Sequence, residues 1–75
     1  MELDAFVKGF ANQFDETDIS ELSADTVYQD LDEWGSLISM SIIAFVKTEC
    51  GKTVTGKEIR SCETIRDLFE LVSSK

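Results

Sequence analysis

The chain has 75 residues, of which 43% are hydrophobic, and a formal net charge of −8. This length predicts one domain over residues 1–75, with a composition typical of a folded chain. The negative charge disfavours nucleic acids and anionic membranes as partners, because both are negatively charged themselves. The chain has no histidine, so it cannot build a Ser-His-Asp or Cys-His nucleophile, which argues against an enzyme.

The sequence shows no signal for membrane insertion or secretion. No apolar run approaches the roughly 20 residues that span a bilayer. The N-terminus lacks a basic stretch followed by an apolar one, so we expect no signal peptide and a cytoplasmic protein. Cys50 and Cys62 are expected to be free thiols, as is usual inside cells, and to pack as small hydrophobic residues. Zinc is not expected, because it needs about four ligands and the chain has no histidine.

The first predicted element is a helix over residues 2–14. Its apolar residues recur at the helical spacing of three and four, and they are Leu3, Phe6, Val7, Phe10 and Phe14. Glu2 and Asp4 lie in its first turn, where the helix dipole favours negative charge. Gly9 is expected to weaken this helix slightly without breaking it.

Residues 15–35 show no sustained helical period and are expected to form a long loop, with at most one short helical turn. No Lys or Arg occurs from residue 9 to residue 46. The acidic residues of this stretch are Asp15, Glu16, Asp18, Glu21, Asp25, Asp30, Asp32 and Glu33. Such a field would attract basic protein surfaces, although a merely solvated acidic loop is the alternative interpretation.

A second helix is predicted over residues 36–50. Ser36 is a suitable N-cap, and Gly51 can adopt the left-handed conformation that ends a helix. Apolar residues lie almost all around this segment, so it is either the central helix or carries an exposed docking face. A strand over residues 42–46 is the less favoured interpretation, because the length and the capping signals favour a helix.

Two further helices are predicted, a short one over residues 56–61 and an amphipathic one over residues 64–73. The sequence therefore predicts an all-α fold, a small four-helix bundle with a long loop between helices one and two. The residues expected in its core are Phe6, Phe10, Leu31, Met40, Ile43, Ile65, Leu68 and Phe69.

The segment before the second helix resembles the attachment site of the acyl carrier protein family. In that family an Asp-Leu pair precedes a turn, and Asp-Ser-Leu then opens the second helix. The corresponding residues here are Asp30, Leu31, Asp32, Glu33, Trp34, Gly35, Ser36 and Leu37. The acidic loop, Gly51 and the segment 64–68 also fall where the family has equivalents, so the resemblance covers nearly the whole chain.

The resemblance implies a covalent 4′-phosphopantetheine arm on Ser36, between Gly35 and Leu37, attached from coenzyme A by a phosphopantetheinyl transferase. The arm would hold acyl groups as thioesters. The protein, a monomer and not itself an enzyme, would shuttle them among acyl-loading, condensing and tailoring enzymes of fatty acid, polyketide or related synthesis. A helix N-terminus suits the phosphate of such an arm. A plain helix cap is the alternative role of Ser36.

The sequence departs from the family pattern at two places. Gly35 replaces the usual Asp before the serine, and the second helix lacks most of the family's acidic residues. We therefore hypothesise partners that recognise a more apolar second helix. The residues expected to bind partners are Asp30, Asp32, Glu33, Trp34, Ile38, Ser41 and Glu49. Trp34 could instead pack against the end of the bundle, which is the favoured interpretation.

The sequence also bears on two functions other than that of a carrier. A helical adaptor module without a prosthetic group is the second hypothesis, favoured by Gly35 and the apolar second helix.

The segment that begins at Asp30 partly matches a calcium-binding EF-hand loop. It has Trp34 at the fifth position and Ser41 at the twelfth, so we expect no EF-hand, and at most weak divalent binding by the loop acids.

Overall fold

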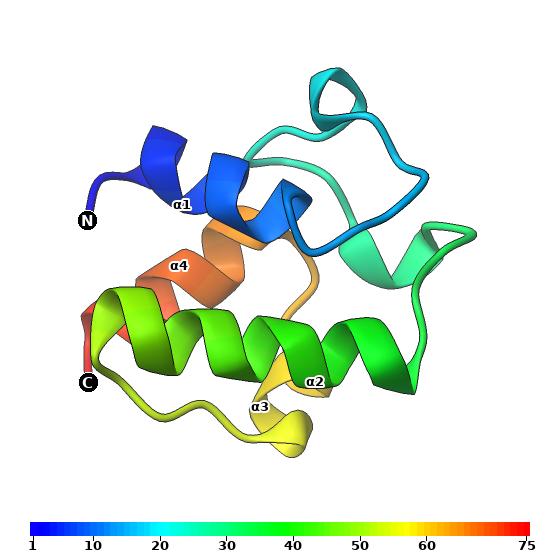
Figure 1. Cartoon of the computed structure of the whole chain (residues 1–75). Helices are drawn as coiled ribbons and strands as arrows, with labels where there is room; N and C mark the ends of the chain where they lie inside the picture. Colours follow the sequence, from blue (N-terminus) through cyan, green and yellow to red (C-terminus); the bar gives the residue numbers. More distant parts are fainter.

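Four α-helices and no strand build the chain in the computed structural model, which describes residues 1–75 (Figure 1). The helices are α1 (Leu3–Ala11), α2 (Ser36–Phe45), α3 (Gly56–Ser61) and α4 (Ile65–Ser73). Short 3₁₀ turns, η1 (Ile19–Glu21) and η2 (Tyr28–Asp30), lie in the long connection between α1 and α2. This arrangement confirms the prediction of a small all-helical bundle with a long loop after the first helix. The loop contains two helical turns, where the sequence predicted at most one.

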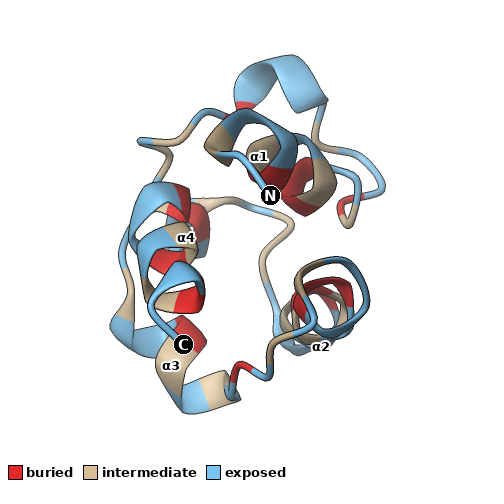
Figure 2. Cartoon of the chain, turned by 90° about the vertical axis from the view of Figure 1, so that its left-hand side faces the viewer, coloured by how far each residue is buried: buried red, intermediate tan, exposed pale blue.

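The core lies between α1, α2 and α4, whose buried faces point toward one another (Figure 2). It contains no buried polar or charged side chain. The fully buried residues with the largest side chains are Tyr28, Phe6, Phe10, Ile42, Ile59, Ile65, Leu68, Val46 and Val54. Because a domain of this size buries only about 60% of its surface on folding, each large side chain carries much of the stability.

Most of the predicted core residues pack inside. Phe6, Phe10, Ile65 and Leu68 are fully buried, and three more pack against the core while half-buried, namely Leu31, Ile43 and Phe69. Met40 was predicted to be buried, and this is wrong, because its side chain is 66% exposed.

The reason for the error at Met40 is the rotational setting of α2. Ile38, Ile42 and Phe45 are its buried positions, and their spacing of four and three places them on one face. Met40 falls on the opposite face of the helix and points outward.

The second helix runs as far as the sequence predicted but changes its winding. After Phe45 the chain continues as the π-helical segment η3 (Val46–Cys50). Gly51 then takes a left-handed conformation with φ of +65°, which confirms its predicted role as the helix stop. The first helix is shorter than predicted and ends at Ala11, although Phe14 beyond it is still buried.

The long loop is joined to α3 through hydrogen bonds from η2. The Tyr28 hydroxyl donates to the carbonyl oxygens of Ile59 and Cys62. The Gln29 side-chain amide donates to the carbonyl oxygens of Arg60 at 3.1 Å and Cys62 at 3.0 Å. Carbonyls at the end of a helix have no partner within it, so the loop satisfies the groups that α3 leaves free.

The N-terminal ends of α3 and α4 are each capped by side chains close to them in sequence. Thr55 and Glu58 form a capping box at the start of α3, and Thr64 and Asp67 form one at the start of α4. Each box satisfies backbone N–H groups that the first turn leaves free. These caps let a helix as short as α3 keep a defined orientation.

Gly9 is required by the contact between α1 and α2. A Cβ atom at this position would overlap the aromatic ring of Phe45. The bare glycine therefore lets the Phe45 ring lie directly on the α1 backbone. This packing role explains a glycine within a helix, where it is otherwise unfavourable.

We predict that Gly9→Ala destabilises the protein, although alanine is the better helix former. Overpacking against Phe45 should cost about 1–3 kcal/mol, which exceeds the helix-propensity gain of about 1 kcal/mol. Urea denaturation followed by circular dichroism measures the change. In the Phe45→Leu background, which makes room for the methyl group, the cost of Gly9→Ala should shrink. A Gly9→Ala protein more stable than the wild type would contradict the proposed contact.

Candidate functional site

Ser36 is exposed and occupies the first helical position of α2, with Gly35 as the N-cap residue. The prediction that Ser36 itself caps the helix is therefore wrong by one position. The physical reason is that the extended backbone falls at Gly35, with φ of −176° and ψ of −174°, and helical geometry begins at Ser36. No side chain caps this helix, and Ser36 is exposed and has no hydrogen-bond partner for its side chain within the protein.

The first turn of α2 also presents free backbone donors beside that hydroxyl. The first backbone bond of the helix runs from the N–H of Ser39 to the carbonyl of Gly35, at 2.9 Å. The N–H groups of Ser36, Leu37 and Ile38 therefore have no backbone acceptor. Free donors and the positive end of the helix dipole together favour an oxyanion next to Ser36.

A hollow of about 380 Å³ extends from Ser36 between α2 and α3. Its volume lies within the range of small-molecule sites. Its lining combines polar and apolar side chains, which include Trp34, Ser36, Ser39, Met40, Ile43 and Arg60. A flexible chain attached at Ser36 could lie partly in this hollow.

Trp34 packs at the end of the bundle and sets the path of the chain into α2. Its ring lies parallel to that of Phe10, with centroids 6.4 Å apart, and its centroid is 4.9 Å from that of Tyr28. The side chain is half-buried. The structure thus favours packing over partner contact for Trp34, and the packed ring fixes the two residues before the helix.

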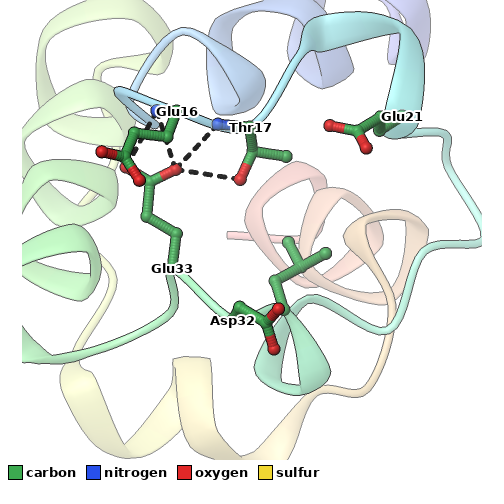
Figure 3. A pocket seen from close by; sticks show the side chains of 6 residues that line it. Glu16, Thr17, Glu21, Asp32 and Glu33 are labelled. Carbon is green, nitrogen blue, oxygen red and sulfur yellow. Dashed lines mark hydrogen bonds between the residues drawn. The ribbon is translucent and has the colours of Figure 1, made fainter.

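Glu33 connects the start of the long loop to its end (Figure 3). Its carboxylate accepts hydrogen bonds from the backbone N–H groups of Asp15 at 2.7 Å, Glu16 at 3.0 Å and Thr17 at 2.9 Å. The Thr17 hydroxyl donates a further bond at 2.9 Å. Glu33 was expected to bind partners, and the structure instead gives it this internal role.

The hydrogen bonds to Glu33 also lower the pKa of its carboxyl group. Desolvation acts to raise the pKa of Glu33, but the hydrogen bonds from Asp15, Glu16 and Thr17 outweigh it and hold the pKa below its usual value. The ionised form is therefore the one that binds the loop.

The acidic loop encloses a second hollow, of about 480 Å³. Its acidic lining residues are Glu16, Glu21, Asp32 and Glu33. No group of three or more carboxylate, thiolate or imidazole side chains is placed to hold a metal ion. The geometry therefore gives no support to divalent binding by these acids.

The outer face of α2 differs from the predicted partner surface. Ile38 was expected to bind partners, but its side chain is only 7% exposed and packs in the core. Leu37 is 76% exposed and Met40 is 66% exposed, so these two apolar residues lie on the surface near Ser36. Apolar residues surround α2, so the sequence carried no clear signal for which face is exposed.

The remaining predicted partner residues lie at or near the surface. Asp30, Asp32 and Glu49 are exposed, and Ser41 is half-buried. Gly35 is exposed as well, and a Cβ atom added there would meet nothing within 4 Å. The structure therefore leaves space for the aspartate that the acyl carrier family usually has at this position.

Cys50 and Cys62 are free and half-buried, as the sequence predicted. Burial raises the pKa of both thiols above the ordinary value, so they are poor nucleophiles. Their environment suits the packing role expected for them.

Neither a protein-family model, nor a curated protein, nor a solved structure matches the chain. None of its helices combines the length and apolar character needed to cross a bilayer. Function is therefore inferred from the geometry around Ser36 itself.

We predict that Glu33→Gln destabilises the protein at neutral pH and flattens its acid sensitivity. A lowered folded-state pKa means that the stabilisation is present above the unfolded-state value of about 4.3 and is lost as the pH falls through the folded-state value. Urea midpoints measured from pH 7 down to pH 3 test this.

Asp32→Asn is the matched control for Glu33→Gln, because Asp32 is an exposed neighbouring acid with no hydrogen bond in the structure. The control should keep the wild-type profile. Asp18 and Glu58 also have pKa values lowered by hydrogen bonds, so Glu33→Gln should retain part of the acid sensitivity. Identical profiles for Glu33→Gln and the wild type would contradict the role of Glu33.

Proposed function

We propose that the protein is an acyl carrier protein that bears a 4′-phosphopantetheine arm on Ser36. The observation that carries this proposal is the Ser36 hydroxyl, which is exposed, free of hydrogen bonds and placed at the start of α2 beside free N–H groups. The resemblance of residues 30–37 to the acyl carrier attachment site adds support. So does the small helical bundle with its long first loop.

The residues around Ser36 fit a phosphate-linked arm. The hydroxyl oxygen is the point of attachment, and the N–H groups of the first turn of α2 would orient the phosphate oxygens. The arm supplies a thiol that carries the acyl group as a thioester. Trp34, Met40 and Ile43 would shelter apolar parts of the arm or its cargo from water in the hollow between α2 and α3.

We predict that incubation with coenzyme A and a broad-specificity phosphopantetheinyl transferase adds one phosphopantetheine to the wild type. Ser36→Ala should gain nothing. Ser39→Ala, which alters a serine in the same hollow, should be modified at the wild-type rate. Intact-mass spectrometry measures all three, with a known carrier protein in the same tube as a positive control.

Gly35→Asp distinguishes a poorly recognised carrier from a chain that is not a carrier. Because space is open at Gly35, the variant should fold and be modified at least as fast as the wild type. If neither protein gains mass while the known carrier does, the carrier function is wrong.

The surface near Ser36 indicates which partners such a carrier would use. Leu37 and Met40 form an exposed apolar pair on α2, and the acids Asp30 and Asp32 lie in the preceding loop. The acids would speed the approach of basic enzymes, and the apolar pair would form the close contact. Loading, condensing and tailoring enzymes with an apolar docking site fit this surface.

We predict that enzymes of ordinary fatty acid synthesis, which read an acidic second helix, use the holo protein poorly. Lys47→Glu combined with Thr48→Glu adds acidic charge to the exposed end of this helical segment and should raise their rate by about tenfold at low salt. Lys47→Gln with Thr48→Gln is the neutral control and should give a smaller gain. If these enzymes elongate acyl chains on the wild-type holo protein at normal rates, the idea of dedicated partners is contradicted.

A second candidate function is a helical adaptor module without a prosthetic group. The exposed Leu37 and Met40 side chains favour it, because such a pair could bind a partner protein without any covalent group. The mass measurement separates the two functions, since an adaptor would gain no phosphopantetheine.

A further inference from the structure

The hollow beside Ser36 has a charge unlike the rest of the molecule. The structure contains four hollows, and this one alone is lined by a cationic side chain without any acidic one. The cation is Arg60, on α3. In a chain of net charge −8, a hollow lined by a cation without an acidic side chain is the exception.

The guanidinium of Arg60 is free of protein partners. The two ion pairs of the structure join Arg66 to Asp25 and Lys75 to Glu58, and neither includes Arg60. A guanidinium has five N–H donors, which match carboxylate and phosphate oxygens. Its binding capacity therefore remains available on the side of the hollow.

The backbone around Arg60 holds it in a defined place. A guanidinium nitrogen lies 3.3 Å from where a Cβ atom of Gly56 would be, so the side chain crosses the bare backbone of that glycine. The helix is fixed by its capping box at one end and by Gln29, which bonds to the carbonyl of Arg60, at the other. Arg60 is thus presented to the hollow from a fixed helix.

We propose that Arg60 forms an oxyanion-binding site for the arm attached at Ser36 or for its cargo, an assignment that rests on the proposed carrier function. The shared chemistry is a phosphate or carboxylate that accepts hydrogen bonds from the guanidinium. The source is either the phosphodiester at Ser36 or a terminal carboxylate on a short acyl group. Met40 and Ile43 would contact methylene groups of the arm or the cargo.

The test compares four forms of the protein, which are apo, holo, acetyl-holo and succinyl-holo, prepared from coenzyme A and its thioesters and verified by intact mass. NMR follows the Nε–Hε signal of Arg60, and thermal melting follows stability. Arg60→Gln removes the site. Lys57→Gln removes the same charge from an exposed position of α3 outside the hollow and serves as the matched control.

We expect the Arg60 signal to shift at one step of the series. A shift on going from apo to holo identifies the phosphodiester, and a shift only in the succinyl form identifies the cargo carboxylate. The same step should raise the melting temperature in the wild type and in Lys57→Gln but not in Arg60→Gln. Because the Arg60 side chain has no protein partner, circular dichroism should show that Arg60→Gln is folded.

Two results would overturn the assignment, and the mass measurement separates them. A loaded protein whose Arg60 signal is the same in all four forms has no oxyanion site at Arg60, and the carrier function stands. A protein that gains no mass at Ser36 is not a carrier, and the role of Arg60 falls with it.

Discussion

The buried side chain of Tyr28 joins three parts of the structure that come from separate segments of the chain. Its ring lies 5.3 Å from that of Phe10 on α1 and 4.9 Å from that of Trp34 at the entrance to α2, measured between centroids. Its hydroxyl donates to the last carbonyls of α3. Burial raises the pKa of Tyr28, so the phenol stays protonated and keeps this donor. In so thin a core, one residue thereby fixes three helices relative to one another.

The consequence for the site is that a long loop delivers Ser36 to a defined position. Tyr28 and Trp34 hold the loop to the core by packing, and Glu33 holds its two ends together by bonding to the backbone of residues 15–17. Between these attachments and α2 lies only Gly35, which has no side chain to cap the helix. The absence of a cap leaves the N–H groups of the first turn free beside the exposed Ser36, which is the arrangement that a covalent phosphate would use.

The helices were predictable because local signals define them. The periodic apolar residues of α4, for example, set its face, and the left-handed Gly51 ends the second helix as expected. Which side of α2 is buried was not predictable in the same way, because apolar residues surround the helix. The predictions for Ile38 and Met40 failed for that reason. The role of Glu33 depends on contacts with residues far away in sequence, and the proposed role of Arg60 depends on the docking of α3. Neither leaves a local pattern.

The distribution of charge and apolar surface is consistent with brief encounters rather than a stable complex. The acidic loop would increase the rate of association with basic surfaces, an effect that acts over distances near the Debye length of about 10 Å. The apolar contact near Ser36 is small, because on this face only Leu37 and Met40 are large and exposed. Small interfaces dissociate quickly, so fast arrival would be combined with fast release. A carrier that must visit several enzymes in turn needs both.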